Sequence, residues 1–414
     1  MNLRTAIALM LLPAAVLAEP AADEMGRQEG YPRARTPAEY ALPKFRIGSW
    51  SAPADAVAPS YRIRRVAPSG ETVAPWANME PAPPITYQYR NVGYTLDEYL
   101  ERQRVTGLLI LKDGKIVVER YRYDRKPDAR FISFSMAKSV TSLLVGIALE
   151  RGQIASLDDP AERYAKELAG SPYGGTTVRQ LLRMSSGLRF TERYDGTDDV
   201  MRLNRSMQFE DTPQVSFLRG IADRHAPAGE KFVYASAETQ VLGRVLAGAT
   251  GRTVADLTHD WLWKPMRAQD DAFWRISPDG QEGTFAFFHA SLRDWARLGL
   301  LLANDGVADG KQVVPREYLL DATDPARQPA AFRPERATPY FGYGYQFWLF
   351  PMKQRTFGMQ GVYGQAVFVQ PSSGIVMVQT SAWAQPSGQQ DPQPAQERSA
   401  FWRGVLRSLG GSIE

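Results

Sequence analysis

Two β-hairpins, one near each end of the chain, constrain the fold more than any other feature of these 414 residues. The segment TGLLILKDGKIVVERYRY is two β-type runs joined by Asp113-Gly114, a pair that accepts the positive φ angles of a two-residue turn. The segment GQAVFVQPSSGIVMVQTSA is a second hairpin, which turns at Pro371-Ser372-Ser373-Gly374. An antiparallel sheet that joins the N- and C-terminal parts is the economical interpretation.

The chain between the hairpins has mostly helical patterns. FSMAKSVTSLLVGIALERG has the apolar spacing of a buried helix closed by Gly152, and ASAETQVLGRVLAGATG and SLRDWARLGLLLANDG are further helices ended by glycine. A last helix is expected at about 395–409. This order predicts an α+β domain over 86–414, an antiparallel sheet flanked by helices, with an inserted all-helical lobe at roughly 156–270.

The segment before this domain has two parts. Residues 1–18, MNLRTAIALMLLPAAVLA, combine Arg4, an apolar run and a small-residue cleavage pattern, which is typical of a secretory signal peptide. Residues 19–85 are rich in proline and keep no helical period, which predicts an extended arm partly packed on the body. We therefore expect an exported, periplasmic protein without a stable membrane anchor. An uncleaved anchor is the alternative.

Composition excludes several kinds of site. The chain has no cysteine, and its histidines, His225, His259 and His289, do not pair at metal-ligand spacing, so no metal or organic cofactor is expected. The net charge of +4 comes without a long basic block, which disfavours nucleic acid as a partner. His289 is expected to be a structural histidine, and Arg293 and Asp294 an ion pair or helix caps. The oligomeric state is left open.

Ser135 and Lys138 stand three residues apart at a predicted helix start, so their side chains share one face. A helix N-terminus offers unpaired N–H groups and a positive dipole end, which stabilise an oxyanion. A half-buried lysine has a lowered pKa that suits a base. The alternative is an ordinary serine helix cap. The G-x-S-x-G elbow is absent and histidine is scarce, which disfavours a Ser-His-Asp triad.

Two further segments hold candidate partners for Ser135. Tyr234 begins Tyr234-Ala235-Ser236, between a Pro-Ala-Gly turn and a helix, where it could project into a cleft or pack in the core. Gly358, Gly361 and Gly364 open a strand, and glycine there allows a substrate or another backbone to approach closely. An ordinary β-bulge is the alternative for the glycines.

Together these segments resemble the serine β-lactamase/penicillin-binding protein superfamily. Ser135-Met136-Ala137-Lys138, then Tyr234-Ala235-Ser236, then a glycine-bearing strand are most similar in order and spacing to its class C β-lactamase branch. That branch includes family VIII esterases and 6-aminohexanoate-dimer hydrolases. The stretches LDDPAERY, VRQLLRMSSGLRFTERY and GVYGQAVFVQP are similar as well. The resemblance covers roughly residues 90–410 and implies a β-lactamase/transpeptidase-like fold.

The resemblance implies a role for each matched catalytic residue. Ser135 would be the acylated nucleophile and Lys138 its base. Tyr234 would help to relay the proton to the leaving group and later activate water. The oxyanion hole would consist of the backbone N–H groups of Ser135 and Val362.

Substrate contacts follow from two other matched segments. The third family motif, usually Lys-Thr-Gly, is matched here by Met359-Gln360-Gly361, so Gln360 and Gly361 would face the substrate. The cation that usually holds a substrate carboxylate is then missing. Tyr194 matches a tyrosine that contacts the substrate amide in similar amide hydrolases. Asp198 and Asp199, in the same loop, could attract a substrate amino group or form a solvated acidic loop.

These inferences predict an exported serine hydrolase that cleaves a small-molecule ester or linear amide through a Ser135 acyl-enzyme. One alternative is a β-lactamase or D,D-carboxypeptidase, which the missing cation disfavours. Another is a non-catalytic peptide- or peptidoglycan-binding protein on the same fold, which the presence of Ser135, Lys138 and Tyr234 disfavours.

Overall fold

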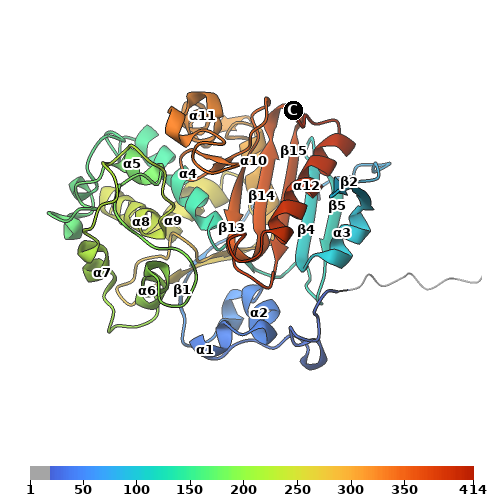
Figure 1. Ribbon diagram of the computed structural model, residues 1–414, viewed down its shortest axis with the longest axis horizontal. Helices are drawn as coiled ribbons and strands as arrows, with labels where there is room; N and C mark the ends of the chain where they lie inside the picture. Colours follow the sequence, from blue (N-terminus) through green and yellow to red (C-terminus); the bar gives the residue numbers. More distant parts are fainter. Residues whose placement is uncertain (1–18) are drawn as a thin grey trace, which may run out of the picture.

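The computed structural model describes residues 19–414, and a seven-stranded antiparallel sheet lies at its centre (Figure 1). The expected signal peptide, 1–18, lies outside the described residues. The strand order is β11-β12-β13-β14-β15-β4-β5. The strands are β4 Val105–Lys112, β5 Lys115–Tyr121, β11 Gly342–Tyr343, β12 Trp348–Leu349, β13 Phe357–Gly361, β14 Gln365–Gln370 and β15 Ile375–Ser381. Because β4 pairs with β15, the two predicted hairpins are neighbours in one sheet, which confirms the prediction.

Both hairpin turns have the backbone that their residues favour. Asp113 and Gly114 have φ angles of 51° and 75°, and Gly374 has a φ angle of 60°. The two turns meet at one end of the sheet, where the Asp113 N–H donates to the Gly374 carbonyl at 2.9 Å. The left-handed φ angle of Gly374 favours glycine at this position, and a β-carbon there would displace the Asp113 carboxylate, whose Oδ1 would lie 2.2 Å away.

Helices cover both faces of the sheet, because successive residues of the central strands β4, β14 and β15 are buried on opposite faces. Leu109 and Leu111 of β4 face the core that holds α4 and α10, whereas Leu108 and Ile110 face the core that holds α12. The flanking helices are α3 Leu96–Arg102, α4 Met136–Glu150, α10 Leu292–Ala303, α11 Arg316–Thr323 and α12 Gln393–Ser408. The last of these confirms the predicted C-terminal helix. Within residues 19–414, no helix is long and apolar enough to cross a membrane.

A group of helices lies beside the sheet, at the left of Figure 1. Its long helix α8 begins directly after the Tyr234-Ala235 pair and packs on α4 and α5. Gly251 ends α8 in the left-handed conformation, with a φ angle of 66°, as the sequence predicted. The helices are α5 Val178–Leu182, α6 Asp199–Ser206, α7 Gln214–Gly220, α8 Ser236–Thr250 and α9 Val254–Thr258.

A second, four-stranded sheet supports the start of α4. Its order is β1-β7-β8-β6, and β6 ends just before the Ser133–Ser135 turn. The Ser133 N–H donates to the Phe288 carbonyl of β8 at 2.7 Å, which anchors the turn to this sheet. The strands are β1 Arg62–Val66, β6 Phe131–Ile132, β7 Ala272–Ile276 and β8 Phe288–Ala290.

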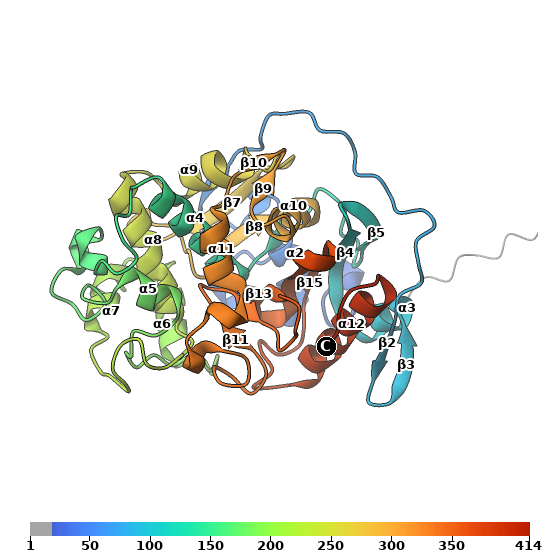
Figure 2. The same ribbon diagram turned by 90° about the horizontal axis from the view of Figure 1, so that it is seen from above.

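The arm at 19–85 contains regular structure that the sequence analysis did not predict. It forms the short helices α1 Pro37–Tyr40 and α2 Pro43–Trp50, and its strand β1 joins the second sheet. Both helices begin with proline at the first position, where proline is compatible with a helix, so a proline-rich composition concealed them. Figure 2 shows the segment after β1 arching along the edge of the molecule to the hairpin β2 Thr86–Tyr89 and β3 Val92–Thr95.

Candidate active site

Ser135 lies at the junction of β6 and α4, in a turn with unusual backbone geometry. Phe134, directly before it, has a φ angle of 40°, a left-handed conformation that disfavours a bulky side chain. The Ser133 hydroxyl holds this turn by accepting from the Phe288 N–H at 3.2 Å and contacting the Ala286 carbonyl at 3.2 Å. Within residues 19–414, the Ser135 hydroxyl caps no helical N–H, so Ser135 is not an ordinary side-chain cap.

Lys138 is the immediate partner of Ser135. Its Nζ lies 3.0 Å from Ser135 Oγ, 2.9 Å from Ser236 Oγ and 2.8 Å from the Phe285 carbonyl oxygen. The side chain is only 1% exposed. Burial lowers the pKa of Lys138 to about 8, with the Glu192 carboxylate acting in the opposite direction. A substantial fraction of Lys138 is therefore neutral near pH 8, as a base for the Ser135 hydroxyl must be.

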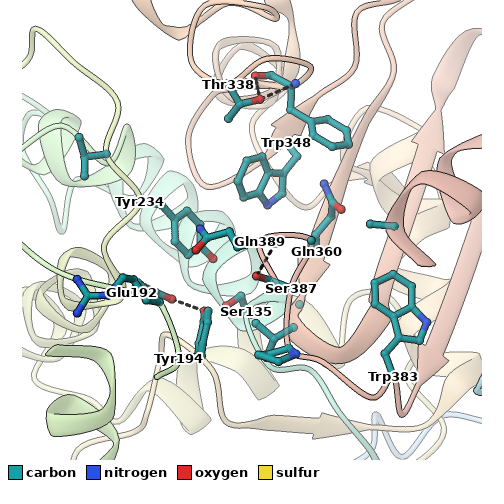
Figure 3. Close-up of a pocket in the computed structure, with 18 of the residues that line it drawn as sticks. Ser135, Glu192, Tyr194, Tyr234, Thr338, Trp348, Gln360, Trp383, Ser387 and Gln389 are labelled. Carbon is teal, nitrogen blue, oxygen red and sulfur yellow. Dashed lines mark hydrogen bonds between the residues drawn. The ribbon is translucent and has the colours of Figure 1, made fainter. Parts of the chain in front are cut away.

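Tyr234 approaches Ser135 from the lobe side of the cleft (Figure 3). Its ring stacks on Trp348 with centroids 5.5 Å apart, and Lys138 Nζ lies 5.0 Å from the ring centroid. Burial raises the pKa of Tyr234 well above its ordinary value, Glu192 raises it further, and a hydrogen bond with Ser135 lowers it. Tyr234 is therefore a neutral phenol at ordinary pH, which suits a proton donor or relay more than a phenolate base.

Ser135 and Tyr234 line a cleft of about 700 Å³ between the helical lobe and the central sheet. Gln360, Gly361 and Val362, at the end of β13, line the same cleft. A β-carbon on Gly361 would lie 2.4 Å from the Ser133 carbonyl oxygen, so glycine allows β13 to pass directly beside the nucleophile turn. The predicted oxyanion residues Ser135 and Val362 are thus brought to one wall of one cleft.

The third motif differs from the sequence-based interpretation in the position of its cation. Met359 is 1% exposed and packs in the core, while Gln360 accepts a hydrogen bond from Arg398 Nη2 at 2.5 Å. Arg398 belongs to α12 and also lines the cleft. Burial lowers its pKa to about 10, so the guanidinium stays charged near neutral pH. The cleft therefore has a cation, supplied by a helix instead of the strand.

Arg398 has unused capacity to bind an anion. Its other contacts are the Gln365 carbonyl oxygen, 3.3 Å from Nη1, and the faces of Phe368 and Trp383, about 5 Å away. Within residues 19–414, no carboxylate pairs with this guanidinium, and its Nε has no hydrogen-bond partner. A buried, uncompensated cation is costly, so an anionic group in the cleft would be stabilised there.

Tyr194 lines the cleft, and a chain of hydrogen bonds connects it with Lys138. The Tyr194 hydroxyl donates to Glu192 Oε1 at 2.6 Å. Glu192 also accepts from the N–H and the hydroxyl of Ser236, both at 2.9 Å, and Ser236 Oγ in turn contacts Lys138. Glu192 and Ser236 were not among the predicted site residues, although both lie within two residues of one. The one feature of the sequence that could have indicated them is that Glu192 lies close to Tyr194 and Ser236 lies close to Tyr234.

Asp198 and Asp199 are not free to attract a substrate. Asp198 is 3% exposed and caps α6, accepting from the N–H groups of Arg193, Tyr194 and Met201. Asp199 accepts from the N–H and hydroxyl of Thr191 at 2.9 and 2.7 Å. Both alternatives from the sequence are therefore wrong for Asp198, because the loop's own N–H groups occupy its buried carboxylate. Asp199 is partly exposed, and its carboxylate also pairs with Arg202 at 3.5 Å.

The remaining candidate polar residues lie outside the cleft. His289 stacks on Phe273 at 4.2 Å, and burial lowers its pKa to about 3. Arg293 pairs with Glu119 at 2.7 Å instead of with Asp294, which is buried and accepts from the Ser291 hydroxyl. Among residues 19–414, no cluster of three His, Cys, Asp or Glu side chains could hold a metal ion.

The sheet, the helical lobe and the Ser135–Lys138–Tyr234 cluster define a class, the serine hydrolases of β-lactamase/transpeptidase-like fold. Comparison with known families agrees with this class: the Beta-lactamase family model matches residues 94–400. The chain therefore belongs to the Beta-lactamase family. Both the predicted fold and the predicted family are confirmed.

Three known proteins illustrate the relationship. The chain is 29% identical over 308 residues to the 6-aminohexanoate-dimer hydrolase of Paenarthrobacter ureafaciens, covering 70% of this chain and 76% of that protein. A solved Bacillus anthracis protein, provisionally assigned as a 6-aminohexanoate-dimer hydrolase, has a TM-score of 0.77 at 21% identity, over 88% of this chain and 94% of that one. A family VIII carboxylesterase has a TM-score of 0.53 at 16% identity, over 73% and 93%. The two structural likenesses establish the fold alone.

Proposed function

We propose that this protein hydrolyses a small ester or a linear amide through an acyl-enzyme on Ser135. One observation carries the proposal: the buried Lys138 Nζ lies 3.0 Å from Ser135 Oγ, and burial lowers its pKa to about 8. A serine hydroxyl becomes a nucleophile when such a base takes its proton.

The proposed reaction has two halves. Neutral Lys138 accepts the Ser135 proton as Oγ attacks the substrate carbonyl, and the oxyanion is held by the N–H groups of Ser135 and Val362. The proton returns through Tyr234 to the leaving alcohol or amine as its bond to the carbonyl carbon breaks. Water then attacks the acyl-enzyme and passes one proton to neutral Lys138, with the Tyr234 hydroxyl as a relay. The bond between Ser135 Oγ and the carbonyl carbon breaks, and Lys138 returns the proton to Oγ. No cofactor takes part.

The cleft favours a substrate with an anionic group near its leaving side. Arg398 and Gln360 present a cation and an amide side chain beside Ser135, and Tyr194 faces them across the cleft. A linear amide that ends in a carboxylate fits this arrangement, and one relative is named as a 6-aminohexanoate-dimer hydrolase. We therefore propose such amides, together with small esters, as the substrate class.

A β-lactamase or D,D-carboxypeptidase is the second candidate. The cation that the sequence analysis found missing is replaced by Arg398, and β-lactams and D-alanyl peptides also carry a carboxylate. A non-catalytic binding protein is the third candidate, and it requires an unreactive Ser135.

A single panel separates these candidates: p-nitrophenyl acetate, the 6-aminohexanoate dimer, nitrocefin and a D-Ala-D-Ala peptide, each tested with wild type and Ser135→Ala. We expect the ester and the linear amide to be cleaved, with at least a thousandfold loss of kcat/KM in Ser135→Ala. Faster turnover of nitrocefin than of both would establish the second candidate. Folded protein that no fluorophosphonate probe labels at Ser135 would establish the third.

We also propose that the mature chain begins at Glu19 and resides in the periplasm, since residues 1–18 have the pattern of a signal peptide. Fractionation of expressing cells and N-terminal sequencing test this. An intact N-terminus in the cytoplasmic or membrane fraction would contradict it.

A further inference from the structure

We infer that the N-terminal arm, residues 19–85, builds a second subsite at Ser135 that takes an apolar acyl chain of the substrate. The inference rests on the proposed function and specifies its substrate. The family model starts at residue 94, so the arm lies outside the part of the chain that the family match covers. The arm's side of this subsite therefore consists of residues that the family model does not match.

The arm forms one wall of a second cleft, of about 670 Å³, that also opens at Ser135. Pro37, Ala38 and Tyr40 of the α1 helix and Trp50 of α2 line it from the arm side. Ser135 and Val362 border both this cleft and the first one. The nucleophile and the proposed oxyanion hole therefore lie where the two clefts meet. One cleft can then hold the acyl part of an ester or amide while the other holds its leaving group.

Trp50 fixes the arm to the residues that flank the oxyanion hole. Its ring packs edge-to-face on Phe134, with centroids 5.0 Å apart, and lies 4.7 Å from the ring of Tyr363. Phe134 directly precedes Ser135, and Tyr363 directly follows Val362. The arm therefore contacts both sides of the proposed oxyanion hole.

Arg46 adds a polar attachment from the same helix. Its Nη1 donates to the carbonyl oxygens of Trp383 and Ala384, both at 2.9 Å, and its guanidinium lies 4.8 Å from the ring centroid of Tyr363. Aromatic packing and hydrogen bonds together hold α2 in one position, so this wall is a built part of the site.

Tyr234 decides which part of the substrate enters each cleft. It lines the first cleft and not the second. Because Tyr234 is the proposed proton donor to the leaving group, the leaving group belongs in the first cleft, near Arg398. The acyl portion then extends into the second cleft, against the arm.

The lining of the second cleft indicates an apolar acyl chain. Opposite the arm lie Phe285, Phe287, Val200 and Met201. Three arginines line this cleft. Arg202 pairs with Asp199 at 3.5 Å and Arg205 with Asp211 at 2.6 Å, whereas the Arg275 guanidinium has no carboxylate partner among residues 19–414 and is packed on the rings of Tyr61 and Phe287, 3.5 and 4.5 Å from their centroids. The lining is therefore suited to methylene groups or an aryl-alkyl chain.

The test compares p-nitrophenyl octanoate with p-nitrophenyl acetate in wild type and in Ala38→Trp. Ala38 is exposed on α1, so the new indole narrows the second cleft without removing packed atoms. We expect the octanoate-to-acetate ratio of kcat/KM to fall at least about tenfold, the lower end of the effect of one methylene group in an apolar pocket. Trp50→Ala, which enlarges the cleft, should also change this ratio. Ala74→Trp, at an exposed arm position away from both clefts, should keep the wild-type ratio.

Octyl acetate distinguishes the acyl subsite from the leaving-group cleft, because its long chain is in the leaving group. In Ala38→Trp we expect its kcat/KM, relative to that of p-nitrophenyl acetate, to equal the wild-type value. A loss confined to octyl acetate, or an unchanged octanoate ratio in Ala38→Trp, would overturn the subsite while leaving the proposed function intact. Hydrolysis that persists in Ser135→Ala would instead overturn the proposed function itself.

Discussion

At the scale of single residues, the position of Lys138 sets the pH at which the proposed chemistry can run. Three hydrogen bonds and nearly complete burial hold its Nζ beside Ser135 Oγ, and burial lowers its pKa to about 8. We expect kcat/KM for p-nitrophenyl acetate to rise about tenfold per pH unit below 8 and to level off above it, because only neutral Lys138 accepts a proton. A pH–rate profile measures this, and a flat profile between pH 6 and 9 would contradict it.

The same shift affects stability. The pKa of Lys138 in the folded protein is lower than in the unfolded chain, so between about pH 8 and its ordinary value the unfolded chain binds more protons. The contribution of this residue to the free energy of unfolding therefore rises with pH through that interval. Folding destabilises the charged form of Lys138 relative to its neutral form, because burial removes the ammonium group from water. The three hydrogen bonds to Nζ offset this cost of burial only in part.

Glu192 provides a residue-scale test of the electrostatics. Its negative charge raises the pKa of Lys138, and its carboxylate holds Ser236, which contacts Lys138. In Glu192→Gln we expect the acidic limb of the pH–rate profile to move to lower pH, by on the order of one unit. Asp195→Asn, an exposed carboxylate in the same loop, is the matched control and should leave the limb in place. A limb that moves to higher pH in Glu192→Gln would show that Glu192 acts in another way.

The sequence predicted Ser135, Lys138 and Tyr234 but not Arg398 or Glu192, for a physical reason. The first three occur in short motifs with fixed spacing, which are local properties. Arg398 lies in a polar stretch of a C-terminal helix, QPAQERSAFWRG, where an arginine normally faces solvent. Only the packing of α12 on the sheet buries it and turns it toward Gln360.

At the scale of elements, the approach of β13 to the nucleophile turn depends on Gly361. A β-carbon there would lie 2.4 Å from the Ser133 carbonyl oxygen, a backbone atom that cannot easily move. We expect Gly361→Ala to lower the free energy of unfolding by about 1–3 kcal/mol. The rate of Ser135 labelling by a fluorophosphonate should fall at least tenfold, because the turn must shift.

Gly93→Ala is the matched control for this substitution. Gly93 lies in strand β3, and a β-carbon there would have no atom within 4 Å. Thermal unfolding and labelling rates of both variants measure the effect. Equal Tm values and equal labelling rates for Gly361→Ala and wild type would contradict the prediction.

The elements also show where sequence patterns are informative. Both hairpins were predictable, because Asp113-Gly114 and Ser373-Gly374 specify their turns locally. The helices α1 and α2 were not, because they are short and each begins with proline, a residue that usually indicates the absence of helix. Their position beside Ser135 depends on contacts with residues more than eighty positions away, which no local pattern records.

At the scale of the whole molecule, the central sheet joins the two ends of the domain. Gly107 in β4 and Thr380 in β15 are 273 residues apart and are paired. We expect a chain that ends at residue 370 to lack cooperative thermal unfolding and fluorophosphonate labelling, because β4 then loses its partner and one face loses α12. Calorimetry and probe labelling beside the full chain measure this. A truncated chain that unfolds cooperatively and is labelled would contradict it.

The pairing of β4 with β15 also has a consequence in time. A ribosome adds about 5–20 residues per second, so some tens of seconds pass between the synthesis of Ser135 and that of its last supporting strand. During that interval β13 and β15 do not yet exist, and Lys138 is still in water with its ordinary basicity. We expect Ser135 to be unreactive in the nascent chain and to become reactive only when β15 has joined the sheet. Because β13 and β15 are synthesised last, this topology delays hydrolysis until the whole chain has been made.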